Sequence, residues 1–284
     1  MLSTQPTESK LRSNSTMARD PFVHNWSAYY WTRILQKLDI TGMTLGVSGK
    51  ARCTIPNPPG ILKSFATPEG RKNFEDDASL QAVRKLVRSA KSFWDVGANY
   101  GIFSLFAMDE NPDLFIVSIE ASTVHYQTLS SNWALQPSER WVCLHTAVGD
   151  RDGVTYLSRC RSGFDHIVED SKAEADTEVE LRPVAKLDTL AAVLATESID
   201  VLKIDVEGYE LKVLHGATTL LDQRRIGAIV LESDGHDLRY GSSEAETIHF
   251  LEAREYRVDS SLSRVGKASG NCLVFKSNES GIQR

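Results

Sequence analysis

The chain has 284 residues, of which 41% are hydrophobic, and its 32 Lys and Arg residues against 38 Asp and Glu residues give a net charge of −6. This balance is typical of a globular protein with a full core, and an acidic chain without a long basic segment argues against nucleic-acid binding. No run reaches the ~18 consecutive apolar residues of a membrane span. Four scattered cysteines without a C-x-x-C pair exclude common zinc-site spacings and indicate a cytoplasmic protein.

The N-terminal part of the chain precedes the main pattern of elements. The aromatic residues of 25–38 recur at near-helical spacing, which predicts a helix whose aromatic stripe packs internally or faces a substrate. Residues 43–47 and 52–55 can form a short hairpin, which a proline-rich segment then ends. We therefore expect a disordered polar tail at 1–18, an arm with a helix and a hairpin at 19–75 that caps the substrate, and a main domain at 76–277.

A glycine turn stands between a predicted strand and a predicted helix. The sequence D-V-G-A-N-Y-G at 95–101 contains Gly97 and Gly101, which can take positive φ and allow a ligand close to the backbone. A dinucleotide fingerprint, G-x-G-x-x-G, has three glycines around a pyrophosphate. Here Asp95 precedes two glycines four residues apart, and its charge would repel a pyrophosphate. S-adenosylmethionine fits better, because it carries a sulfonium, an ammonium and no phosphate. A turn used only for packing is the alternative.

Short apolar segments alternate with helical patterns along the rest of the chain. Strands are expected at 92–96, 114–119, 141–145, 199–204, 226–231, 256–259 and 272–275, and helices at 77–90, 102–108, 124–133, 187–195, 210–221 and 245–254. This alternation predicts an α/β fold with a mostly parallel sheet that has helices on both faces. Residues 159–183 are charged and weakly periodic, so we expect an excursion over the sheet rather than sheet strands.

Carboxylates gather at the carboxyl ends of the predicted strands. They are Asp95, Glu120, Asp205, Glu207, Glu232 and Asp234. Ligands of open α/β sheets bind at this edge. Carboxylates placed together repel one another unless cations or hydroxyls lie between them. The cluster therefore indicates a functional site, although a single acid at such a position often only caps a helix.

The chain here resembles a known family. The turn at 95–101, Glu120, the sequence LDTL at 187–190, and KIDVEGYE at 203–210 followed by VLHGA at 213–217 are similar to the FkbM family of methyltransferases, over about residues 90–235. The resemblance implies a Rossmann-like seven-stranded sheet, S-adenosylmethionine as cofactor, and O-methylation of a hydroxyl on a small molecule, sugar or lipid. The family often has Glu-Pro where this chain has Glu120-Ala121.

Cofactor contacts are expected along the same edge. Asp95 and the backbone of the glycine turn would hold the methionine end, and Glu120 would accept hydrogen bonds from both ribose hydroxyls. Ala147 and Asp150 would lie by the adenine. The full set of predicted cofactor residues is Asp95, Gly97, Asn99, Gly101, Glu120, Ala147, Asp150 and Asp205.

Catalysis requires mainly positioning and exclusion of water, because the sulfonium is already activated. A hydroxyl nucleophile can also need a base within hydrogen-bond reach, and Asp205, Glu207 and His236 are the candidates. The strand-end acids could instead bind Mg²⁺, but we favour a metal-free site. The acceptor is expected to be a small molecule or carbohydrate and not a nucleic acid. The alternatives are a binding module without activity, or an NAD-dependent oxidoreductase, which the missing third glycine disfavours.

Overall fold

The computed structural model describes residues 42–48, 51–56, 76–136, 138–159, 165–168, 178–233, 236–265 and 271–277. The predicted tail at 1–18 and the predicted helix at 25–38 lie outside these residues. The predicted hairpin is confirmed, because β1 (Gly42–Ser48) pairs antiparallel with β2 (Ala51–Pro56). None of the helices in the described part is long and apolar enough to span a membrane.

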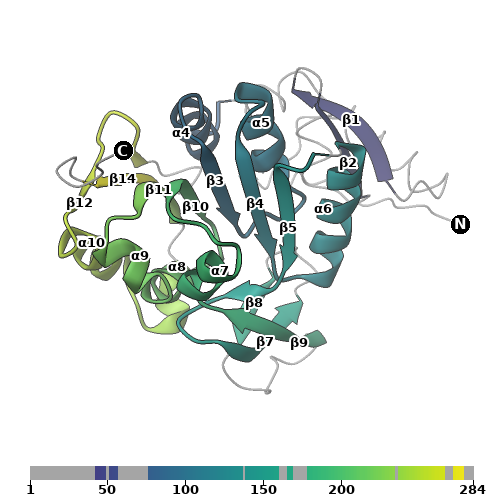
Figure 1. Cartoon of the computed structure of the whole chain (residues 1–284). Helices are drawn as coiled ribbons and strands as arrows, with labels where there is room; N and C mark the ends of the chain where they lie inside the picture. The colour runs from purple at the N-terminus through teal and green to yellow at the C-terminus, as the bar shows by residue number, and fades with distance from the viewer. Residues whose placement is uncertain are drawn as a thin grey trace, which may run out of the picture.

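A central sheet runs through the molecule, as predicted (Figure 1). Its strands are β3 (Ser92–Val96), β4 (Phe115–Glu120), β5 (Trp141–His145), β10 (Ile199–Ile204), β11 (Ile226–Ser233), β12 (Tyr256–Val258), β13 (Arg264–Val265) and β14 (Asn271–Ser277). Seven of them follow in the order β12-β14-β11-β10-β3-β4-β5, and β13 pairs with β14 beside this path. On this path β14 alone runs opposite to the other strands. The fold is the predicted Rossmann-like α/β fold.

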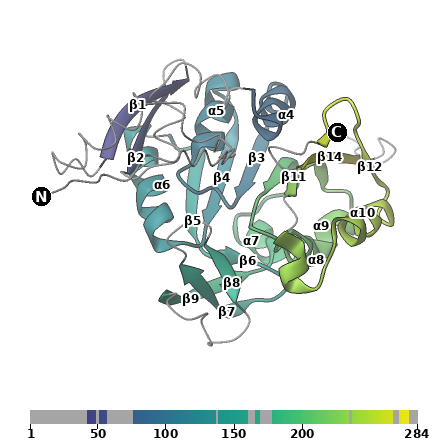
Figure 2. The ribbon, with the colours of Figure 1, turned by 180° about the vertical axis from the view of Figure 1, so that it is seen from behind.

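Helices cover both faces of the sheet because successive strand residues point to opposite sides. On β3, Phe93 packs into the core under α4 (Ala78–Val87), α5 (Ile102–Glu110) and α6 (Thr123–Leu135), while Trp94 packs into the core on the other face. That second face carries α7 (Leu187–Val193), α8 (Glu210–His215), α9 (Thr218–Asp222) and α10 (Glu244–Glu252) (Figure 2).

The helix expected at 210–221 is divided into α8 and α9. Gly216 separates them, and a β-carbon there would stand 2.0 Å from the carbonyl oxygen of Gly149. The side chain of Asp188 then accepts hydrogen bonds from the N–H groups of Thr219 and Leu220 in the first turn of α9. The break therefore brings the chain close to Gly149 and gives α9 a cap of its own.

A second sheet lies beyond the carboxyl ends of β3, β4 and β5 (Figures 1 and 2). It has the order β6-β9-β7-β8, with β6 (Ala147–Val148), β7 (Gly153–Arg159), β8 (His166–Val168) and β9 (Glu178–Ala185). The prediction of no sheet strands in 159–183 is therefore wrong. Arg159 forms ion pairs with Glu178 and Glu180 across β7 and β9, so one face of these strands is charged rather than apolar. In β9 the polar residues Glu178, Glu180 and Arg182 do alternate with apolar residues, but Leu181 and Pro183 are exposed, so the alternation does not mark a buried apolar face.

Candidate functional site

The glycine turn between β3 and α5 is held against neighbouring elements of the chain. Gly97 has a φ of 75°, and a β-carbon there would stand 1.7 Å from the carbonyl oxygen of Asp205. Gly101 has a φ of 80°, and a β-carbon there would stand 2.6 Å from Cδ1 of Leu129. Only glycine combines this φ with so little space. The turn lies where the strand order reverses between β3 and β10, the place where open α/β sheets bind ligands.

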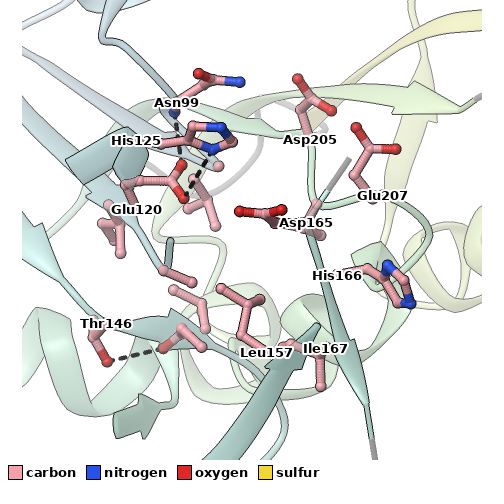
Figure 3. Close-up of a pocket in the computed structure, with 17 residues that line it drawn as sticks. Asn99, Glu120, His125, Thr146, Leu157, Asp165, His166, Ile167, Asp205 and Glu207 are labelled. Atoms are coloured by element: carbon pink, nitrogen blue, oxygen red, sulfur yellow. Dashed lines mark hydrogen bonds and ion pairs between the residues drawn. The ribbon is translucent and has the colours of Figure 1, made fainter. Parts of the chain in front are cut away.

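A cavity opens at this point, between the ends of β3, β4 and β10 and the second sheet (Figure 3). Six of the predicted site residues line it, namely Gly97, Asn99, Glu120, Ala147, Asp205 and Glu207. They come from separate parts of the chain and meet because parallel strands end at one edge. The structure thus brings together the predicted ribose, adenine and acceptor residues.

Glu120 is fixed at the cavity wall by two backbone N–H groups. Its Oε2 accepts a hydrogen bond of 2.7 Å from the N–H of Asn99, and its Oε1 accepts one of 2.7 Å from the N–H of Ser122. Only 9% of the side chain is exposed. Burial raises the pKa of Glu120 to about 7, although the two backbone N–H groups favour the charged form. Each oxygen keeps lone-pair capacity for a ligand hydroxyl.

Asp95 lies inside the protein and does not line the cavity. Its Oδ2 accepts a hydrogen bond of 2.8 Å from Ser104, and its Oδ1 lies 3.5 Å from Nζ of Lys203 on the adjacent strand. The charge that we expected to face a cationic ligand faces an internal lysine instead. Asp95 can therefore act on the cofactor only indirectly, through the backbone of the glycine turn.

Gly101 and Asp150 also lie away from the cavity lining. Gly101 is the N-cap of α5, and Asp150 forms an ion pair of 3.0 Å with Lys212. The predicted place of Asp150 beside an adenine stays a prediction, as does the role of each residue above. Ala147, in β6, does line the cavity.

The turn after β10 presents two carboxylates to the cavity. Asp205 follows the strand directly, and its Oδ2 lies 3.1 Å from Nζ of Lys203. Glu207 has a φ of 55°, in the left-handed region. The turn is fixed by Glu210, whose Oε1 accepts hydrogen bonds from the N–H groups of Val206 and Gly208. Glu207 is thus not needed as the cap, and a side chain held on a costly backbone conformation beside a cavity is typical of a functional residue.

The other acids of the predicted cluster lie around Lys203. Burial disfavours the charge on Lys203, but the carboxylates of Asp205, Asp95 and Glu232 outweigh it and raise its pKa above the ordinary value. Asp234 and the side chain of His236 are outside the described residues; the backbone of His236–Tyr240 forms a short 3₁₀ helix, η2. In the described part, no three His, Cys, Asp or Glu side chains are grouped as a metal site.

Sequence reasoning missed residues from α6 and the second sheet. They are His125, Thr146, Leu157, Asp165, His166 and Ile167, all of which line the cavity. Nδ1 of His125 lies 3.9 Å from Oε1 of Glu120, and Figure 3 shows the carboxylate of Asp165 directed toward Glu120 from the opposite wall. The position of His125 in the helix turn after Glu120 was a usable signal. Asp165, which directly precedes β8, had none, because β8 was not recognised.

The polar lining of the cavity suits S-adenosylmethionine, which carries no phosphate group. No Lys or Arg is among the described residues that line it, so a pyrophosphate would meet carboxylates without a cationic partner. Glu120 and the backbone of the turn would hold the ribose and the methionine end. A Rossmann-like sheet with an acid after its second strand and a two-glycine turn after its first defines the site of a class I methyltransferase.

The chain belongs to the FkbM family of methyltransferases: the methyltransferase FkbM domain matches residues 95–258. The resemblance inferred from the motifs is thereby confirmed, and S-adenosylmethionine is the cofactor. The chain has no match among curated protein sequences.

Three solved structures illustrate the similarity. Precorrin-6y C5,15-methyltransferase from Geobacter metallireducens GS-15 is 13% identical with a TM-score of 0.42, over 70% of this chain and 87% of that one. The putative methyltransferase yhhF from Escherichia coli is 12% identical with a TM-score of 0.46, over 83% and 99%. TrmK of M. capricolum, in complex with S-adenosylhomocysteine, is 10% identical with a TM-score of 0.42, over 72% and 70%.

Proposed function

We propose that the protein transfers the methyl group of S-adenosylmethionine to a hydroxyl of a small-molecule or carbohydrate acceptor. The observation that supports this reaction is the pair of carboxylates, Asp205 and Glu207, on one wall of the cavity next to the glycine turn. A hydroxyl is a weak nucleophile, and a carboxylate within reach can take its proton during the transfer.

The residues divide between binding and proton transfer. When bound, S-adenosylmethionine would supply an activated methyl group for transfer to the acceptor oxygen. The backbone at Gly97 and Asn99 orients the methionine end, and Glu120 binds the ribose hydroxyls. Glu207 receives the hydroxyl proton, with His236 as the other candidate, and Asp205 orients the reacting groups.

The charge of the cavity supports a small uncharged acceptor rather than a nucleic acid. Glu120, Asp165, Asp205 and Glu207 line it, with no Lys or Arg among the described lining residues. A phosphate backbone needs cationic contacts, whereas carboxylates accept hydrogen bonds from hydroxyl groups.

Cys143 and Cys272 are free thiols, which supports a reducing compartment such as the cytoplasm.

Methyl-labelled S-adenosylmethionine and a panel of acceptors test the proposal. The panel contains a neutral sugar, an amino sugar, a uronic acid, a simple polyol and total RNA, and mass spectrometry locates the new methyl group. We expect label on a hydroxyl of a neutral acceptor and strong loss of transfer in Glu207→Gln. The exposed Glu197, at the amino end of β10, provides the matched control Glu197→Gln. Label only on nitrogen, or only on RNA, would overturn the proposal.

A further inference from the structure

Lys203 is a charged residue in the interior of the sheet. Only 1% of it is exposed, and it lies on β10 directly opposite Asp95 of β3 in the pairing register. Its Nζ lies 4.5 Å from the ring centroid of Phe103 on α5. Burying a charged group in a sheet is costly unless it is paired. A buried ion pair is also weak support for stability, since apolar pairs of similar size often serve as well. Packing alone therefore does not account for Lys203.

A continuous polar chain leads through the interior to Lys203. Nε1 of Trp141 donates to Oγ of Ser118 at 2.8 Å, and Oγ of Ser118 lies 2.7 Å from Oγ of Ser104, which donates to Asp95. Because Ser104 gives its proton to Asp95, Ser118 must donate to Ser104. Every hydroxyl thus accepts one hydrogen bond and donates one, which fixes the orientation of Asp95.

The chain ends at the cavity. Lys203 lies between Asp95, at 3.5 Å, and Oδ2 of Asp205, at 3.1 Å. Asp205 is the one member of this series that lines the cavity, with 35% of its side chain exposed. The buried hydrogen-bond chain therefore reaches the cavity only at the carboxylate of Asp205. The connection is the ammonium of Lys203, which Asp95 holds on its other side.

We propose that Lys203 is a positioning residue, whose ammonium, anchored by Asp95, fixes the carboxylate of Asp205 at the cavity wall for contact with the bound cofactor and the acceptor. A partly exposed aspartate without this anchor would sample several rotamers. Each contact of Asp205 with a ligand would then have to offset the entropy lost when its side chain is ordered. The inference uses the role of Asp205 in the proposed function, but it concerns only how that side chain is held.

A double-mutant cycle tests the proposal without an acceptor. Asp95→Asn/Lys203→Met removes both buried charges together, so neither is left unpaired. Urea unfolding reports its stability, and calorimetry reports the affinity for S-adenosylhomocysteine, which keeps the ammonium of the cofactor. We expect Asp205→Asn and Asp95→Asn/Lys203→Met each to bind about tenfold more weakly, as for one lost charge-assisted hydrogen bond. The triple variant should be weaker than Asp205→Asn by no more than a factor of about two.

Two outcomes would overturn the role of Lys203. One is wild-type affinity in folded Asp95→Asn/Lys203→Met, and the other is a triple variant whose loss is the product of the separate losses. If the methionine variant does not fold, Asp95→Asn/Lys203→Gln takes its place in the same cycle and is judged by the same two outcomes. Failure to transfer methyl groups to hydroxyls would reject the proposed function. The binding measurements of this cycle would still test the role of Lys203, because they need no acceptor.

Discussion

The carbonyl oxygen of Asp205 occupies the place where a β-carbon at Gly97 would stand, with a separation of 1.7 Å. The two residues end neighbouring parallel strands, and the N–H of Asp205 donates to the carbonyl of Val96, one residue before the turn. The backbone of the cavity wall is therefore assembled by direct contact between the glycine turn and the loop that carries Asp205. Glycine is required at this position by the chain itself, before any ligand binds.

Gly97→Ala should reduce both stability and cofactor binding. The substitution adds a clash with a backbone atom to the cost of a positive φ, so we expect a loss of more than ~2 kcal/mol in the free energy of unfolding. Gly241→Ala is the matched control, because Gly241 has a φ of 68° and nothing within 4 Å of the added carbon. It should lose about 1 kcal/mol. If urea unfolding gave the same loss of stability for Gly97→Ala and Gly241→Ala, the contact with the carbonyl of Asp205 would not be the reason for glycine at position 97.

Cofactor binding is expected to depend on Glu120. The protein should bind S-adenosylhomocysteine in the micromolar range, about −8 kcal/mol, and should not bind NAD. Glu120→Ala should weaken the binding of S-adenosylhomocysteine by about 1.5–3 kcal/mol, as for hydrogen bonds to a charged group. Because the pKa of Glu120 is raised to about 7, affinity should also fall as the pH is lowered from 8 to 6. Calorimetry at three pH values measures both effects, and unchanged affinity in Glu120→Ala would reject the ribose contact.

Glu120 should also give stability a recognisable pH dependence. Its pKa rises from the model-peptide value of 4.5 to about 7 on folding because burial disfavours the charge. The folded state therefore binds the proton of Glu120 more tightly than the unfolded state does. This proton binding stabilises the folded state fully below pH 4.5, and the stabilisation is lost as the pH rises through 7. The free energy of unfolding of the wild type, relative to Glu120→Gln, should fall by roughly 1–3 kcal/mol between pH 5 and pH 8. A rise over that range would contradict the buried, proton-binding carboxyl.

The sequence was sufficient for the centre of the large sheet because strands such as β3, β4 and β10 are buried on both faces. Such strands form short apolar runs, and β4, β5, β10 and β11 were each predicted within one or two residues of their ends. The small sheet was missed for the opposite reason. Thr123, Glu180 and Arg182 contact one another on its inner side, so polar residues occupy positions where a pattern search expects apolar ones.

The site was predictable only as far as strand ends are predictable. Glu120 and Asp205 followed from their places after apolar runs. Asp95 had the same signature, yet its side chain is turned inward by Lys203, which lies 108 residues further along the chain. No local pattern encodes a partner at that distance. Asp165 could not be predicted from the sequence, because its position near Glu120 depends on how the small sheet folds over the cavity.

The last prediction concerns metal dependence. Mg²⁺ is held by clustered carboxylate oxygens, and Asp205 and Glu232 end the adjacent strands β10 and β11, as expected. The ammonium of Lys203 already lies 3.1 Å from Asp205, and Asp95 and Glu232 contribute to its raised pKa. The ammonium of Lys203 therefore already lies between Asp95 and Asp205 and offsets part of the negative charge that would otherwise attract a metal ion. The turnover of S-adenosylmethionine should therefore be largely unchanged in EDTA.

Asp205→Asn completes this test, because it keeps the shape of the side chain and removes its charge. If Asp205 acts mainly in the transition state, kcat should fall by about 10²-fold, as for reacting groups that are no longer correctly oriented, with a much smaller change in cofactor affinity. Glu197→Gln, measured beside it, should retain the turnover of the wild type. Steady-state rates with and without EDTA, and after the return of Mg²⁺, give the answer. Activity that disappears in EDTA and returns with Mg²⁺ would place Asp205, Glu207 and Glu232 in a metal site and would remove the case for a metal-free transfer.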